Sequence, residues 1–92
     1  MKAVELFRTK EPHGKGFVEI VIWQVAEPVL RSEHPYKYRL AYVVDGKRLV
    51  GYDNERGKGD HKHLRDVERP YRFVSPQQLI DDFMRDVKGA KR

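Results

Sequence analysis

The residues best suited to chemistry in this 92-residue chain are gathered in one polar stretch, residues 51–63. The stretch has no apolar periodicity, and it contains carboxylates, basic side chains, an amide and two histidines. Gly57 and Gly59 give its middle conformational freedom. Because apolar, regularly patterned segments lie on both sides, we expect residues 51–63 to be a functional loop that a rigid frame positions.

The residue types in this stretch suit cleavage of an RNA phosphodiester without a metal ion. Such cleavage needs one group to take the 2′-hydroxyl proton, another to protonate the leaving oxygen, and cations at the phosphate. Histidine titrates near neutral pH and can perform either proton transfer. A carboxylate can orient a histidine or act as the base. The candidate catalytic residues are therefore His61, His63, Asp53, Glu55 and Asp60.

Binding of the nucleic acid would use basic, aromatic and amide side chains in the same stretch and on one earlier strand. Arginine and lysine bind phosphate, and tyrosine can stack on a base. Residues 36–42 interleave tyrosines with basic side chains, although the favoured interpretation is that these tyrosines pack under a helix with Lys37 and Arg39 in water. The candidate nucleic-acid contacts are Tyr52, Asn54, Arg56, Lys58, Lys62, Lys37 and Arg39.

Two other interpretations of residues 51–63 stay open. The pair His61 and His63 could lie on one side of an extended backbone, with Asp53 or Glu55 as a third metal ligand. This spacing matches no established zinc signature and the chain has no cysteine, so we predict neither a metal nor another cofactor. The other interpretation is a solvated turn whose carboxylates pair with its basic side chains, as is usual in charge-rich loops.

Length and composition limit the class of protein. A chain of 92 residues makes a single domain, residues 1–92, and a domain this small buries a limited share of its surface. We therefore expect support from a partner protein or from a homodimer. The 19 Lys and Arg outnumber the 14 Asp and Glu, and the net charge of +5 favours a polyanion or an acidic protein as partner.

The location of the protein is also suggested by composition. The absence of cysteine favours the cytoplasm. The N-terminal segment lacks the long apolar core of a signal peptide. No apolar run approaches the roughly 20 residues that a membrane-spanning helix needs.

Hydrophobic periodicity predicts the α+β class, with a twisted antiparallel sheet of about four strands and one C-terminal helix packed on one face. In the strand expected at residues 17–25, Val18, Ile20 and Ile22 should face the core. Asp45-Gly46 predicts a hairpin turn. The expected strands are residues 2–9, 17–25, 36–44 and 47–53, with a short further strand at 71–74 and an irregular segment at 63–70.

A helix is predicted over about residues 76–88. Ser75 is its expected N-cap, and Gln78 completes a capping box. Leu79, Phe83 and Val87 form an apolar stripe that should face the core. The aspartates of the helix, Asp81, Asp82 and Asp86, are expected to face away from it.

The chain resembles the TumE family of small bacterial and archaeal proteins. Residues 36–46, 51–63 and 71–75 carry the resemblance, which extends over roughly residues 3–88. Its most specific part is the run Gly-Tyr-Asp-Asn-Glu followed by Asp-His-x-His. The positions that match the family pattern are Tyr52, Asp53, Asn54, Glu55, Arg56, Lys58, Asp60, His61 and His63.

The resemblance implies the toxin of a type II toxin–antitoxin pair, with a small helix-turn-helix antitoxin as partner. Toxins of this size and basic character commonly act on RNA, so we expect a ribonuclease with RNA as its substrate. The alternative is a non-catalytic module that binds nucleic acid or protein through Lys37, Arg39 and the basic loop.

Overall fold

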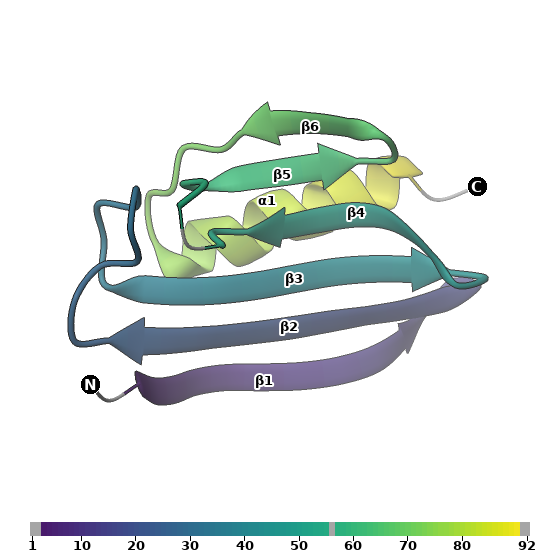
Figure 1. Cartoon of the computed structure of the whole chain (residues 1–92). Helices are drawn as coiled ribbons and strands as arrows, with labels where there is room; N and C mark the ends of the chain where they lie inside the picture. Colours follow the sequence, from purple (N-terminus) through teal and green to yellow (C-terminus); the bar gives the residue numbers. More distant parts are fainter. Residues whose placement is uncertain (1–2, 56, 91–92) are drawn as a thin grey trace.

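In the computed structural model, residues 3–55 and 57–90 are described, and they form an antiparallel sheet with a helix on one face (Figure 1). These residues contain six strands and one helix, and each strand pairs with the next along the chain. The α+β class is confirmed, but the prediction of about four strands is wrong. The elements are β1 (Ala3–His13), β2 (Gly16–Val25), β3 (Tyr36–Val44), β4 (Lys47–Asp53), β5 (His61–Leu64), β6 (Val67–Pro70) and α1 (Pro76–Ala90).

The two additional strands, β5 and β6, form a hairpin from residues expected to be loop or irregular. Their charged sequence lacks the apolar alternation that marks a half-buried strand. The turn between them lacks glycine, and Arg65 adopts its positive φ of 57°. Consequently the described part of the polar stretch is a loop only at residues 54–55 and 57–60, because its first residues belong to β4 and its last to β5. The strand expected at residues 71–74 is irregular and leads into α1.

The core lies between the sheet and α1. The expected inward face of β2 and the apolar stripe of α1 are both buried there, as predicted. Tyr38, Leu40 and Tyr42 of β3 belong to this core while Lys37 and Arg39 stay exposed, which confirms the favoured interpretation of that strand. The core cluster is Val18, Ile20, Ile22, Tyr38, Leu40, Tyr42, Val50, Tyr52, Leu79, Phe83 and Val87.

The start of α1 forms only half of the predicted capping box. The backbone N–H of Gln78 donates to Ser75 Oγ at 3.1 Å, so Ser75 is the N-cap. The Gln78 side chain instead donates to Asp82 Oδ1 at 2.8 Å. The prediction that Asp82 faces away from the core is therefore wrong, because its carboxylate is turned toward the sheet side and also accepts from the Tyr71 hydroxyl at 2.6 Å.

Asp86 was also expected to face away from the core, and the structure contradicts this too. Its carboxylate accepts hydrogen bonds from the Tyr52 hydroxyl and, at 3.2 Å, from Lys62 Nζ. These bonds tie one turn of α1 to β4 and β5. The helix is thus fixed by polar contacts along one edge as well as by its apolar stripe.

The sheet face opposite α1 is open. At the β3–β4 turn, Asp45 and Gly46 take φ values of 52° and 74°, which confirms the predicted hairpin. The register of β4 on β3 starts at this turn and shifts once, between Tyr42 and Val43, after which successive residues of β4 alternate between the two faces of the sheet. Among the described residues, no helix has the length and apolar character needed to cross a membrane.

Candidate active site

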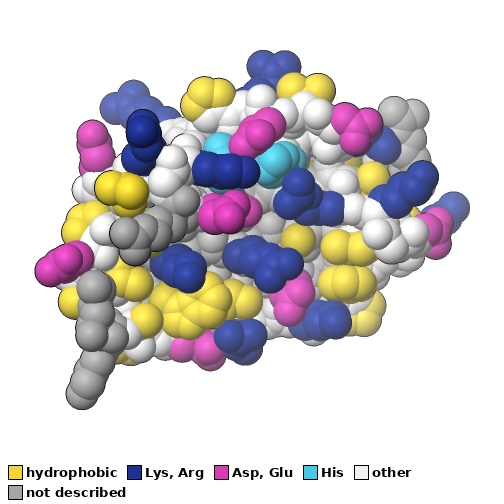
Figure 2. All heavy atoms as spheres, viewed as in Figure 1, with side chains coloured by type: hydrophobic (Ala, Val, Ile, Leu, Met, Phe, Trp, Pro, Cys, Tyr) yellow, Lys and Arg dark blue, Asp and Glu magenta, His cyan; other side chains and the backbone are white. Residues whose placement is uncertain are grey.

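The open face of the sheet brings the candidate residues together from neighbouring strands. Strand register aligns Arg39 of β3 with Asp53 of β4, and Asp53 with His61 of β5. The next row places Gly51 of β4 beside His63 of β5, and His63 beside Glu68 of β6. Figure 2 views this face and shows histidine side chains surrounded by acidic and basic ones.

His61 is buried and is held from two sides. Its Nδ1 donates a hydrogen bond to the Gly59 carbonyl at 2.9 Å, because a carbonyl can only accept. Its Nε2 lies 2.6 Å from Asp53 Oδ1. That contact has the length of an ion pair without the direction of a hydrogen bond, and within the described residues Asp53 Oδ1 is a buried atom with no hydrogen-bond partner. Both ring nitrogens of His61 thus face acceptors.

His63 is the more accessible member of the pair. Its ring stands nearly edge-on to that of His61, with 5.2 Å between the ring centroids. Burial lowers the pKa of His63, and the positive charge of Arg48 lowers it further. Arg48 reaches this position by crossing Gly51, where an added Cβ would lie 2.8 Å from its Cδ. A side chain at position 51 would displace the guanidinium.

A basic hollow adjoins the histidine pair on the same face. It has a volume of about 470 Å³, and Asp53 forms part of its wall. Lys37 Nζ and Arg8 Cζ each lie over the Trp23 ring, 5.7 and 5.8 Å from its centroid, so the hollow contains an aromatic ring with cations against it. The residues that line the hollow are Trp23, Lys37, Tyr38, Arg39, Arg48, Asp53, Asn54 and Glu55.

Three residues at the site were missed by the sequence reasoning: Trp23, Arg48 and Glu68. They come from β2, β4 and β6, and only strand register brings them to the same face of the sheet as the histidines. One signal was available for Trp23, because the alternation of β2 already placed it on the outward face. Glu68 could have been found only by recognising the β5–β6 hairpin.

Asp60 lies away from the histidine pair and holds a different part of the frame. Its carboxylate accepts from Ser32 Oγ at 2.6 Å and from the Tyr38 hydroxyl at 2.7 Å, and it lies 2.7 Å from His34 Nε2. Burial, and then this hydrogen bond, raise the pKa of Tyr38. Asp60 therefore fixes the loop between β2 and β3 to residues 54–60.

Two of the candidate nucleic-acid contacts are inside the protein. Tyr52 belongs to the core, and burial and its hydrogen bond to Asp86 raise its pKa. Asn54 is fully buried, where its amide accepts from the backbone N–H of Tyr38 at 3.0 Å and donates to the Tyr36 carbonyl at 2.8 Å. Neither side chain can touch RNA in this fold.

The remaining candidates lie outside the histidine pair. Lys62 faces the helix side and pairs with Asp86 at 3.2 Å. Glu55 and Lys58 are exposed in the loop, 3.8 Å apart, and Glu55 reaches the hollow but neither histidine. Arg56 lies outside the described residues. The structure thus groups Asp53, His61, His63, Lys37 and Arg39, and separates the rest.

Comparison with known proteins gives one result. A family model described as "Toxin TumE" matches residues 2–91, which is nearly the whole chain. Neither the curated proteins nor the solved structures contain a significant match to this chain. The match agrees with the resemblance carried by residues 36–46, 51–63 and 71–75.

Proposed function

The chain belongs to the TumE toxin family, and from this premise we propose that it is the toxin of a toxin–antitoxin pair and cleaves RNA without a metal ion. One observation carries the proposal: two imidazoles and a carboxylate meet beside a basic hollow on the open face of the sheet. Acid–base groups next to a phosphate-binding surface are what RNA cleavage needs.

The two histidines are suited to opposite proton transfers. The lowered pKa of His63 favours its neutral form, which can take the proton of a 2′-hydroxyl. His61 has an acceptor at each ring nitrogen, the Gly59 carbonyl at Nδ1 and the Asp53 carboxylate at Nε2, so its ring is held in one orientation. In our proposal His63 is the base, and His61 gives its proton to the leaving 5′-oxygen with Asp53 as its orienting carboxylate.

The RNA backbone would bind in the basic hollow. Arg39 and Arg48 can hold a phosphate and stabilise the charge that develops on it, and Lys37 can contact a neighbouring phosphate. The ring of Trp23 offers a surface on which a base could stack. The substrate would then be single-stranded, because stacking on a side chain requires an unpaired base.

The proposed partner follows from the family. A toxin of this type requires an antitoxin, and we propose that a small helix-turn-helix protein binds over the open face and blocks access to the histidines. The net charge of +5 gives such a partner an electrostatic target. Toxin and antitoxin would act in the cytoplasm, where the RNA is.

A second function has its own support. The hollow, with Trp23 beside Lys37, would bind single-stranded RNA whether or not His61 and His63 do chemistry. A non-catalytic binder would depend on Arg39 but not on His63.

The two functions are separated by assaying the purified protein on RNA in the presence of a chelator. The ribonuclease proposal predicts that wild type cleaves and that His63→Gln binds RNA but cleaves at least about 100-fold more slowly. Binding without cleavage by wild type would instead support the non-catalytic function.

A further inference from the structure

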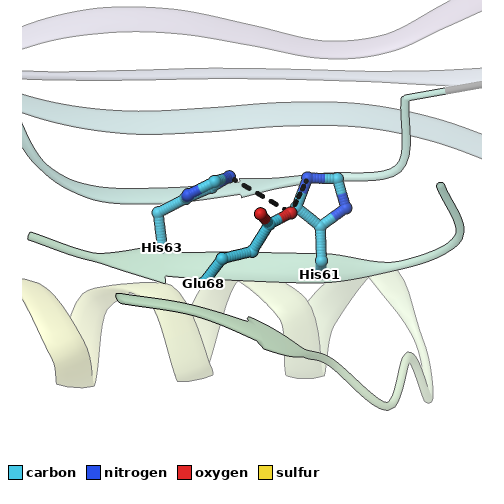
Figure 3. Close-up of side chains that lie close together, drawn as sticks. All are labelled: His61, His63 and Glu68. Carbon is cyan, nitrogen blue, oxygen red and sulfur yellow. Dashed lines mark ion pairs between the residues drawn. The ribbon is translucent and has the colours of Figure 1, made fainter. Parts of the chain in front are cut away.

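A cluster of three side chains, His61, His63 and Glu68, brings two imidazole nitrogens and a carboxylate oxygen close together. Figure 3 shows the Glu68 carboxylate between the two imidazole rings, with all three side chains on the same face of the β5–β6 hairpin. Glu68 Oε2 lies 3.5 Å from His61 Nε2 and 3.8 Å from His63 Nε2. One ligand atom from each residue lies within 4.8 Å of the others.

These separations suit a metal ion better than hydrogen bonds. Hydrogen bonds between nitrogen and oxygen are about 2.7–3.2 Å long, so both contacts to Glu68 are too long. Zinc binds imidazole and carboxylate at about 2.0–2.2 Å in a tetrahedron, which places its ligands about 3.3–3.6 Å apart. The cluster is therefore near the spacing of tetrahedral ligands and needs only small side-chain rotations to reach it.

A second observation concerns the orientation of His61. Metal-binding histidines almost always donate their other ring N–H to a carbonyl or a carboxylate, which fixes the tautomer. His61 does this already, because Nδ1 donates to the Gly59 carbonyl, while Nε2 lies 2.6 Å from Asp53 Oδ1 and 3.5 Å from Glu68 Oε2. Asp53 Oδ1, at 2.6 Å from Nε2, is too close to share the tetrahedron as it stands and would have to turn away from Nε2 when zinc binds.

We infer that His61, His63 and Glu68 bind one zinc ion, and that zinc in this site switches off RNA cleavage. Two imidazoles and one carboxylate select zinc over magnesium, which prefers oxygen ligands. The fourth position would face the open side of the sheet.

The regulatory half of this inference rests on the proposed function. The atoms that would bind zinc are the same Nε2 atoms that would transfer protons, so one imidazole cannot do both at once. Zinc would also place a positive charge where His61 has to donate a proton. A metal-free site would be active, and a zinc-loaded site would be inactive.

The binding half is tested with metal-stripped protein titrated with Zn²⁺ in a calorimeter. Wild type is expected to bind one equivalent, with no response to Mg²⁺. Glu68→Gln should weaken zinc binding at least about tenfold, the smallest loss expected even for an outer partner of a ligand. His13→Gln is the matched control, because His13 packs against Tyr42 away from the cluster.

Three results would overturn the zinc site: no saturable binding by wild type, unchanged affinity in Glu68→Gln, or an equal loss in His13→Gln. A melting-temperature scan with and without Zn²⁺ verifies that each variant is folded.

Inhibition is tested by measuring the RNA cleavage rate of each protein twice, once with Zn²⁺ and once with a chelator. Zinc should abolish cleavage by wild type and slow Glu68→Gln far less at the same concentration. Zinc binding that leaves the wild-type rate unchanged overturns the regulatory half. If wild type cleaves no RNA even in the chelator, the proposed function fails, while the calorimetric titration still decides the metal site.

Discussion

Asp53 is the residue that connects the two parts of the proposed site. Its Oδ1 lies 2.6 Å from His61 Nε2, and its side chain also forms part of the wall of the basic hollow. A buried carboxylate oxygen without a hydrogen-bond partner among the described residues is costly. In the proposed mechanism, this oxygen orients the His61 ring.

Replacing Asp53 by Asn tests this role. The change keeps the shape of the side chain and removes its charge, so kcat for RNA cleavage should fall at least about tenfold, with a smaller change in KM. Asp81→Asn, on the exposed side of α1, is the matched control and should keep the wild-type kcat. Equal rates for Asp53→Asn and wild type would contradict the assignment.

The identity of the site residues could be predicted from sequence better than their arrangement. Asp53, His61 and His63 were chosen because their types suit acid–base chemistry. The expectation that the two histidines lie in a loop was wrong, since both lie on the paired strand β5, whereas Asp53 ends β4 as the strand predicted at residues 47–53 had it. By residue type, Asp60 was as good a candidate as Asp53. Its carboxylate accepts hydrogen bonds from Ser32 and Tyr38, and no local sequence pattern predicts these contacts.

At the scale of elements, periodicity decided which parts of the fold were predictable. β2, β3, β4 and α1 were found because each buries apolar residues at the period of its own backbone. β5 and β6 were missed because their stability comes from pairing with β4 and with each other, while their side chains are mostly polar. Their turn uses Arg65 where a glycine would have been the recognisable signal.

The polar edge of α1 makes the stability of the fold depend on pH. Burial alone would raise the pKa of Asp82, but hydrogen bonds from Tyr71 and Gln78, with the charges of Arg85 and Lys62, lower it below its ordinary value of 3.8. A carboxyl whose pKa is lowered by folding stabilises the folded state when the pH is above the ordinary pKa of that carboxyl. That contribution is lost as the pH falls through the folded-state pKa.

Tyr71→Phe should therefore reduce the free energy of unfolding at pH 7 by about 1–3 kcal/mol, the usual worth of a hydrogen bond to a charged group. The difference from wild type should narrow below about pH 4, as Asp82 becomes protonated. Urea denaturation at pH 7 and below pH 4 measures this difference in the free energy of unfolding. Tyr36→Phe is the control, and a deficit for Tyr71→Phe that stayed constant down to pH 2 would contradict the role of Asp82.

At the scale of the whole molecule, the two faces of the sheet have separate tasks. The face toward α1 holds the core, while the open face carries Trp23, the basic side chains and the histidine pair (Figures 1 and 2). The stable layer thus positions the reactive one, and Tyr38 belongs to both the core and the lining of the hollow. A net charge of +5 adds a general attraction for a polyanion.

Arg39→Gln tests whether the open face is the side that binds RNA. Loss of one phosphate contact should weaken binding and make the dependence of log K on log salt shallower by about 0.7, the value for a single strand. Lys88→Gln removes the same charge from the last turn of α1 and should leave the slope unchanged. Equal effects of the two changes would mean that only net charge matters.

The most direct test of the proposed ribonuclease is made in bacteria. Wild type and His61→Gln/His63→Gln are each induced without the antitoxin, growth is followed, and the 5′ ends of total RNA are sequenced. The account predicts growth arrest with new, discrete RNA ends for wild type and neither effect for the double variant, with both proteins soluble at equal levels. Arrest by both proteins without new RNA ends would contradict it.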